Sequence, residues 1–227
     1  MNIYFWSPFI SEVATIKTVI NTIKSMKDFS KDKNLNLNLI NAFGEWDKME
    51  NIISKLNIDL INFNKIDFSK FLPNYGYFAS RLRYIIIFIS SFFKLHSILK
   101  KNKTDYLICY LITSLPLILI ILFNYKSKVI LRISGLPKLN IFRSILWKLA
   151  SKKIYLVTCP TKETLKKIQS LKIFDPNKIE FLPEPVICLK EFREKKDEKI
   201  LEDNFDKSDS IVSIGRVTKQ KNQLFFI

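Results

Sequence analysis

The fold is decided by residues 3–23, IYFWSPFISEVATIKTVINTI, in which two hydrophobic patterns follow one another. The apolar run Ile3–Trp6 predicts a short buried strand, and Ser7-Pro8 ends it. Within Val13–Ile23, apolar residues recur every three or four positions, which predicts an amphipathic helix. We expect Ser11 to cap this helix. A strand followed by a crossover helix indicates one unit of a parallel sheet.

The same alternation of strand and helix patterns continues along the chain. Further strands are predicted at Leu35–Asn41, Ile58–Phe63, Tyr106–Ile112, Val129–Ile133, Ile154–Val157 and Lys178–Leu182. Helices are predicted between them, at Trp46–Leu56, Arg81–Lys101, Ser114–Phe123, Asn140–Ser151 and Lys162–Leu171. This order predicts an α/β domain with a Rossmann-like parallel sheet and helices on both faces.

Two apolar segments could also span a membrane or contact its lipids. Residues 106–123 are nearly uncharged and approach the roughly 20 residues that a membrane span needs. Ser114 and Pro116 form a helix-start signal inside this segment, so we favour a strand followed by a helix. A membrane protein with one span at 106–123 is the alternative. The helix at 81–101 has more apolar residues than one stripe holds, so it is either buried on both sides or in contact with lipid.

The amino-acid composition limits the classes of partner that we expect this chain to bind. The sequence has 37 basic and 21 acidic residues, a formal net charge of +16, which favours anionic partners such as phosphorylated ligands or an anionic membrane surface. The basic residues are scattered, without an arginine-rich arm, so we expect no nucleic-acid partner. The three cysteines are far apart, which fits reduced thiols, and the N-terminus lacks a secretory signal pattern. These features predict a cytoplasmic protein.

Residues 210–223, SIVSIGRVTKQKNQ, hold a second informative pattern. An apolar strand runs into Gly215, which lets a ligand approach the backbone. Arg216 can grip phosphate oxygens with two hydrogen bonds, and a helix starting near Lys219 would point its N-terminus, with Lys221, at the same place. The segment predicts a diphosphate site; solvated basic residues after an ordinary strand are the alternative.

The domain boundaries follow from composition. Pro183-Glu184-Pro185 ends regular structure, and a highly charged stretch at 190–209 precedes the last predicted strand. We therefore predict a first domain at 1–185, a charged linker at 186–208 and the start of a second Rossmann-like domain at 209–227.

The order strand, Gly-Arg, polar loop, Lys-Asn and helix at 210–223 resembles the opening of the nucleotide-sugar domain in family 4 glycosyltransferases of the GT-B fold. Ser134-Gly135-Leu136-Pro137 resembles an element of bacterial surface-polysaccharide members, and Phe181–Val186 is similar to their interdomain crossing. In the loop at 7–14 the family usually has glycines and ends in Gly-Thr, whereas this chain has Ala14-Thr15.

The resemblance implies transfer of a sugar, with retention, from a nucleotide-activated donor to a saccharide or lipid-linked saccharide acceptor. Its context would be the synthesis of cell-envelope polysaccharide such as lipopolysaccharide. Gly215, Arg216 and Lys221 would hold the donor diphosphate, and the first domain would handle the acceptor. The family's glutamate pair would lie beyond Ile227, so we expect an incomplete second domain and little activity of 1–227 alone. A non-catalytic sugar- or nucleotide-binding remnant is the alternative.

Candidate site residues also follow the strands of the first domain, because ligands of parallel sheets bind beyond the carboxyl ends of the strands. Ser134, Gly135 and Lys138 form one such loop, which suits a phosphate or a sugar hydroxyl. Thr161 and Glu163 stand at a helix start expected to face the same rim. No catalytic residue can be named from these patterns.

Neither a metal nor another cofactor is expected. The sequence has no Asp-x-Asp motif, and its single histidine, His96, has no second histidine or carboxylate pair nearby, so we assign it a structural role. The surface around Arg81, Arg83, Phe92, Phe93 and Lys94 combines cations with apolar side chains. It is expected to rest on the inner face of the plasma membrane if the acceptor is lipid-linked.

Overall fold

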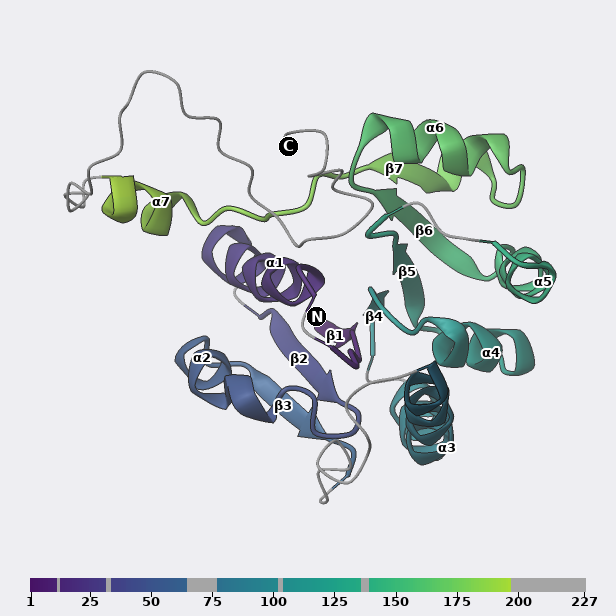
Figure 1. The fold of residues 1–227 in the computed structure, drawn as a ribbon, viewed down its shortest axis with the longest axis horizontal. Helices are drawn as coiled ribbons and strands as arrows, with labels where there is room; N and C mark the ends of the chain where they lie inside the picture. The colour runs from purple at the N-terminus through teal and green to yellow at the C-terminus, as the bar shows by residue number, and fades with distance from the viewer. Residues whose placement is uncertain (12, 32–33, 65–76, 102–103, 136–138, 197–227) are drawn as a thin grey trace, which may run out of the picture. The chain divides into compact units, whose positions relative to one another are not determined.

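The computed structural model describes residues 1–11, 13–31, 34–64, 77–101, 104–135 and 139–196 (Figure 1). Its contacts divide the chain into two units, Met1–Cys188 and Leu189–Ile227. In the second unit the description covers one helix, α7 (Leu189–Lys196), which lies inside the segment assigned to a linker. The predicted start of a second domain, with Gly215, Arg216 and Lys221, lies outside the described residues.

The first unit is built on a seven-stranded, all-parallel sheet with the order β3-β2-β1-β4-β5-β6-β7 (Figure 1). The strands are β1 (Asn2–Trp6), β2 (Asn36–Asn41), β3 (Asp59–Asn62), β4 (Tyr106–Cys109), β5 (Lys128–Arg132), β6 (Ile154–Cys159) and β7 (Ile179–Phe181). Within the first unit a strand is present at each predicted position, and the Rossmann-like α/β fold is confirmed. The order reverses between β1 and β4, which makes this pair the topological switch point.

Helices cover both faces of the sheet. They are α1 (Thr15–Phe29), η1 (Asp47–Met49), α2 (Glu50–Lys55), α3 (Tyr77–Lys100), α4 (Ser114–Leu122), α5 (Ile141–Ala150), α6 (Lys162–Ser170) and η3 (Pro176–Lys178). In Figure 1, α1 and α2 lie on one face, and α3, α4 and α5 lie on the other.

Two apolar cores hold these layers together. Under α1, Val19 and Ile23 pack in one core with Phe5 of β1. On the opposite face, Trp6 of β1 and Leu95 of α3 belong to the second core. Neighbouring residues of β1 therefore supply opposite cores, as the two-residue period of a strand requires.

The start of α1 differs from the prediction. The helix begins at Thr15, and Ala14 stands at its N-cap without a side-chain hydrogen bond. Its first turn is closed instead by the amide of Ile16, which donates to the carbonyl of Val13 at 3.1 Å. Ser11 is exposed and lies too far before the helix, so its predicted capping role is wrong.

Residues 106–123 form a strand and a helix, as favoured above, and the alternative of one membrane span there is wrong. Ile112 separates β4 from α4 with a φ of 46°, a left-handed conformation that no continuous helix contains. The apolar run reflects burial, since central parallel strands are covered on both faces. Within the described residues, one helix is long and apolar enough to cross a membrane by length and composition: Arg81–Lys100, part of α3, of which 28% is buried.

A pair of leucines in α4 tests this arrangement. Leu117 is 0% exposed and Leu122 is 61% exposed. Leu117→Ala is expected to lower the free energy of unfolding by about 2–5 kcal/mol, because it leaves a cavity in the core. Leu122→Ala should change it by less than about 0.5 kcal/mol. Urea denaturation of the whole chain measures both, and equal effects of the two substitutions would contradict the burial of one side of α4.

Candidate functional site

The carboxyl ends of the seven strands meet at one edge of the sheet, and the loops after β1 and β4 flank the switch point. Ile112, in the loop after β4, has the left-handed φ of 46°, which is a rare conformation for a β-branched residue. Its carbonyl accepts a hydrogen bond from Nε1 of Trp6 at 3.0 Å. Unusual backbone held by a buried side chain is typical of functional sites, so this edge is a candidate functional site.

Arg132, the last residue of β5, is a buried cation at this edge. Its Nη2 donates to the carbonyl oxygens of Leu182 at 3.3 Å and Pro183 at 2.9 Å. The guanidinium carbon lies 5.7 Å from the ring centroid of Tyr110, in a cation–π contact. Arg132 thereby fixes the beginning of the segment that follows β7, residues 182–188, which we call the crossing segment.

Side chains of α1 hold the rest of the crossing segment. Oγ1 of Thr18 donates to Oε2 of Glu184 at 3.2 Å, and Nδ2 of Asn21 donates to the carbonyl of Pro185 at 2.6 Å. Nζ of Lys24 lies 3.4 Å from Sγ of Cys188. Thr18, Asn21 and Lys24 are three residues apart, so they share one face of the helix. The crossing segment therefore lies along α1.

Several buried polar atoms at this edge lack a protein partner within the described part of the chain. They are the Oγ atoms of Ser7 and Ser134, Oε1 of Glu184 and Nε of Arg132. We call these four residues the polar rim. A buried polar atom without a hydrogen bond costs about 1–3 kcal/mol, so four of them at one edge call for an explanation. Because these atoms are buried, a ligand with hydroxyl groups could donate to the oxygens and accept from the guanidinium only after a movement at this edge exposes them.

The predicted site residues after β5 fit this edge in part. Ser134 belongs to the polar rim, and Lys138 lies outside the described residues. Gly135 does not have a positive φ, and a Cβ built on it would meet nothing within 4 Å. Neither backbone conformation nor packing requires glycine there, and the space beside it is open to a ligand. The role of this loop in binding stays a prediction.

Thr161 and Glu163 make the contacts of an ordinary helix start. Oγ1 of Thr161 accepts a hydrogen bond from the amide of Thr164 at 3.0 Å, which makes Thr161 the N-cap of α6. Glu163 is exposed and lies 3.5 Å from Nζ of Lys166. These contacts explain both residues structurally, and a part in ligand binding stays a prediction for them too.

Neither Arg132 nor Glu184 was predicted from the sequence to be a site residue. The sequence pattern could have pointed to Arg132, because it is the single charged residue within the apolar run 129–133, where burial of a charge is costly. No local pattern could have pointed to Glu184, because its partner Thr18 is 166 residues away in the sequence.

His96 has a structural environment, with Nδ1 2.6 Å from Oη of Tyr125 and its ring centroid 4.3 Å from that of Phe123. Among the described residues, no group of three or more His, Cys, Asp or Glu could hold a metal.

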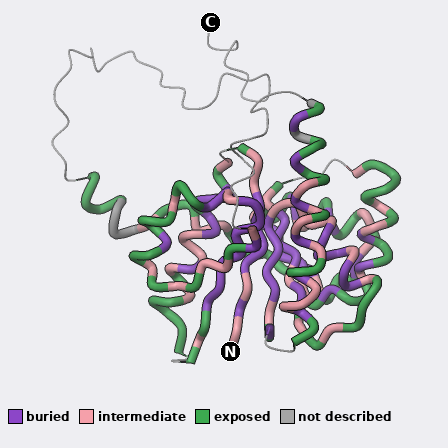
Figure 2. The backbone as a smooth tube through the Cα atoms, turned by 90° about the horizontal axis from the view of Figure 1, so that it is seen from below, coloured by how far each residue is buried: buried purple, intermediate pink, exposed green. Residues whose placement is uncertain are grey.

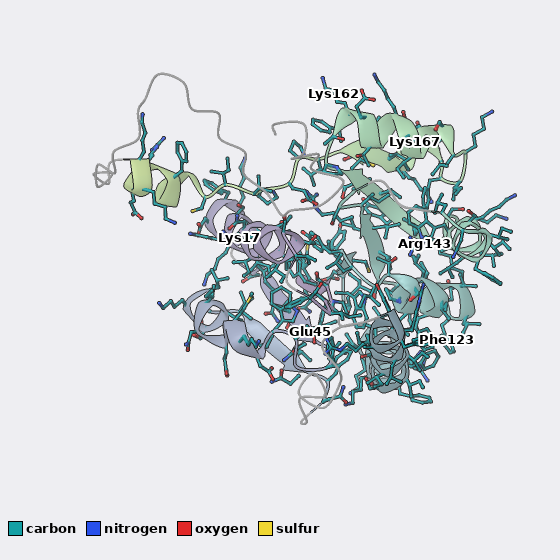
Figure 3. All side chains as sticks on the ribbon, viewed as in Figure 1. Lys17, Glu45, Phe123, Arg143, Lys162 and Lys167 are labelled. Atoms are coloured by element: carbon teal, nitrogen blue, oxygen red, sulfur yellow. The ribbon has the colours of Figure 1, made fainter. Side chains whose placement is uncertain are left out.

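A buried carboxyl group follows β2 at the same edge. Glu45 lies inside the molecule (Figure 3), and its two oxygens accept hydrogen bonds from the amides of Ala42 at 3.0 Å and Phe43 at 2.8 Å. Burial raises the pKa of Glu45 from 4.5 to about 7, although the two amides act in the opposite direction. Glu45 therefore exchanges a proton near neutral pH.

A pocket of about 360 Å³ lies at the opposite edge of the sheet, among residues at the starts of β2 and β3. It is lined by Lys27, Ser30, Leu35, Asn36, Leu37, Asn57, Ile58 and Asp59. Ligands of open parallel sheets bind at the carboxyl edge, so this pocket is a weaker candidate than the polar rim.

Neither a protein-family model nor a curated protein matches this sequence. Among solved structures, UDP-GlcNAc 2-epimerase from Neisseria meningitidis bound to UDP-GlcNAc matches with a TM-score of 0.55 and 13% identity, covering 82% of this chain and 47% of that one. The UDP-N-acetylglucosamine 2-epimerase from Rickettsia bellii matches with a TM-score of 0.52 and 12% identity, covering 86% and 47%.

The UDP-GlcNAc 2-epimerase from Methanocaldococcus jannaschii has a TM-score of 0.50 and 14% identity, covering 82% of this chain and 45% of its own. The present chain thus spans about half the length of these structural neighbours. At such identities the likeness shows a shared fold alone, a Rossmann-like α/β architecture. The fold expected from the resemblance is confirmed at this level, and the particular family stays a proposal.

The pH dependence of stability tests the environment of Glu45. The pKa of the folded state, about 7, lies above the unfolded value near 4.5, so folding favours the protonated form. The stabilisation is complete below about pH 4.5 and is lost as the pH rises through 7, a change of roughly 3 kcal/mol. Glu45→Gln stays neutral and should abolish this slope, measured by urea denaturation at several pH values.

Glu50→Gln changes an exposed carboxyl of the neighbouring helix and should keep the wild-type slope. An unchanged slope in Glu45→Gln would show that the two backbone amides outweigh burial and keep Glu45 ionised.

Proposed function

We propose that this chain forms the acceptor-side domain, with the start of the donor-side domain, of a retaining glycosyltransferase. The enzyme would move a sugar from a nucleotide-activated donor to a saccharide or lipid-linked saccharide in cell-envelope polysaccharide synthesis. One observation supports this most: the polar rim collects unpartnered hydroxyl, carboxylate and guanidinium groups at the carboxyl edge of a parallel sheet. That edge is where sheets of this type bind ligands.

The polar rim suits a saccharide acceptor. Each sugar hydroxyl both donates and accepts, so a single ligand can serve the donor Nε of Arg132 and the acceptor Oε1 of Glu184. The oxygens of Ser7 and Ser134 can turn their hydrogens to suit the ligand. The crossing segment fixes Glu184 against α1, so the carboxylate is positioned before a ligand arrives.

The donor half of the reaction is assigned to the segment resembling family 4 glycosyltransferases. Negative charge builds on the departing diphosphate in the transition state, and fixed cations stabilise it most when they are positioned in advance. In the proposed reaction Arg216 grips the diphosphate oxygens with its planar guanidinium, and Lys221 adds a second charge. The amides of Gly215 and of the following helix N-terminus complete the site, and no metal is needed for this role.

A nucleotide-sugar epimerase is the second candidate, favoured by the structural neighbours, which are UDP-GlcNAc 2-epimerases. In that case the polar rim would hold the sugar of the nucleotide-sugar, and no acceptor would be involved. The two functions differ in whether the sugar leaves its nucleotide.

One experiment separates them. The protein, with the ends that its gene encodes, is incubated with sugar-labelled UDP-GlcNAc and other nucleotide-sugars together with a membrane lipid extract. Glycosyl transfer moves the label into the lipid or saccharide fraction and releases an equal amount of nucleoside diphosphate. Epimerisation leaves the label on the nucleotide and changes the sugar. If neither occurs with any donor, both proposals fail and the chain is a binding module.

Substitution of the two predicted diphosphate ligands tests the donor site. Arg216→Ala and Lys221→Ala are each expected to lower kcat for transfer about 100-fold or more, because each removes charge stabilisation from the transition state. Lys219→Ala removes a charge from the same segment and serves as the matched control, with nearly wild-type kcat. Equal losses in all three variants would contradict specific roles for Arg216 and Lys221.

A further inference from the structure

The helix α3 has a row of exposed apolar side chains along one side. Its members lie three or four residues apart and are Phe78, Leu82, Ile85, Ile89 and Phe93. Phe78 is 86% exposed and Phe93 is 77% exposed. The opposite side of the helix supplies Ile87, Leu95 and Leu99 to the core. Because this side anchors α3 to the sheet, the exposed row faces away from the protein core.

The helix α5 adds a second apolar row on the same layer. Ile141, Phe142, Ile145 and Leu149 are all exposed, and Leu122 at the end of α4 is exposed too. The helices α3 and α5 each pack against α4, on the same face of the sheet (Figure 1). Exposed stretches lie along the outer sides of the helices in Figure 2. We call the exposed apolar residues of α3, α4 and α5 the apolar face.

Part of the apolar face projects beyond the carboxyl edge of the sheet. The helix α3 has 24 residues and is therefore about 36 Å long, whereas strands of three to six residues span at most about 20 Å. The end of α3 leads to Asp105, whose amide bonds to the carbonyl of Asn2 at the amino edge. Near the other end, Nη1 of Arg83 donates to the carbonyl of Ile10 in the loop after β1. The excess length, with Phe78 and Leu82, thus lies on the side of the polar rim.

The charge around the apolar face is of one sign. From residue 68 to residue 162 the sequence holds a single acidic residue, Asp105, and none lies in α3, α4 or α5. Basic residues flank the apolar rows on both long helices: Arg81 and Lys94 on α3, and Arg143 and Lys148 on α5. A surface that binds a protein partner of ordinary composition is expected to carry charges of both signs, to match those of the partner. Apolar rows edged only by cations match the surface of a bilayer that contains anionic lipids.

We infer that the apolar face docks on an anionic membrane surface, with α3 and α5 lying in the plane of the interface. Apolar side chains enter the boundary between headgroups and acyl chains, and the flanking cations contact lipid phosphates. The helix α3 does not cross the bilayer in this arrangement, because its other side remains packed on the sheet. The inference deepens the proposed function, since it places the polar rim close to a lipid-linked acceptor, but docking requires no transferase activity.

Cosedimentation of the 227-residue chain with lipid vesicles tests this inference, without nucleotide-sugar present. Vesicles of phosphatidylcholine containing phosphatidylglycerol should bind the protein at least about tenfold more tightly than phosphatidylcholine alone, since each nearby cation adds about fivefold. High salt should weaken this binding. The double substitution Ile89→Ser and Phe93→Ser should reduce binding by about tenfold or more, because it removes inserted apolar area.

The matched control is the double substitution Phe29→Ser and Ile52→Ser, which changes exposed apolar residues outside the apolar face. It should bind as the wild type does, and thermal unfolding should show that both variants are folded. Equal loss in both variants, or no preference for anionic vesicles, would overturn the inference. Light scattering could also show a dimer that dissociates only in the Ile89→Ser and Phe93→Ser variant. That result would overturn the inference in favour of self-association. Vesicle binding, together with no sugar transfer by the protein with the ends that its gene encodes, would instead reject only the proposed function.

Discussion

The buried guanidinium of Arg132 is the interaction on which the carboxyl edge depends. A charge taken out of water is costly, and here the ring of Tyr110 and the carbonyls of Leu182 and Pro183 offset that cost. The same contacts decide where the chain goes after the last strand. Because the crossing segment begins at this cation and continues along α1, the carboxylate of Glu184 reaches the polar rim.

The all-parallel sheet explains why so much function would gather on one side of the molecule. Its strands need helices on both faces and end at a single edge, and the strand order reverses between β1 and β4, where sheets of this type bind ligands. The crossover to β4 uses a helix far longer than the strands, and its projecting end adds an apolar surface beside that edge. The proposed sugar binding and the inferred membrane contact would then both follow from one topology.

Local patterns in the sequence were enough to predict the strands, because buried parallel strands are short apolar runs bounded by turn residues. Local patterns did not predict where α1 begins or which side chains meet across long distances in the sequence. Ser11 has the chemistry of a cap, but α1 begins later at Thr15. Thr161 is the N-cap of α6, and its predicted place at a ligand rim stays a prediction. Only the charge inside an apolar strand pointed to Arg132, and nothing local could reveal the contact between Thr18 and Glu184.

Ligand binding at the polar rim links these structural features to a function. Nitrogen-edited NMR spectra of the chain during titration with UDP-GlcNAc and with oligosaccharides ending in N-acetylglucosamine test it most directly. Binding at the polar rim should shift the Nε–Hε signal of Arg132 and the amide signals of Ser7 and Ser134. Shifts confined to the pocket around Lys27 and Asp59 at the amino edge, or no shifts at millimolar ligand, would contradict it.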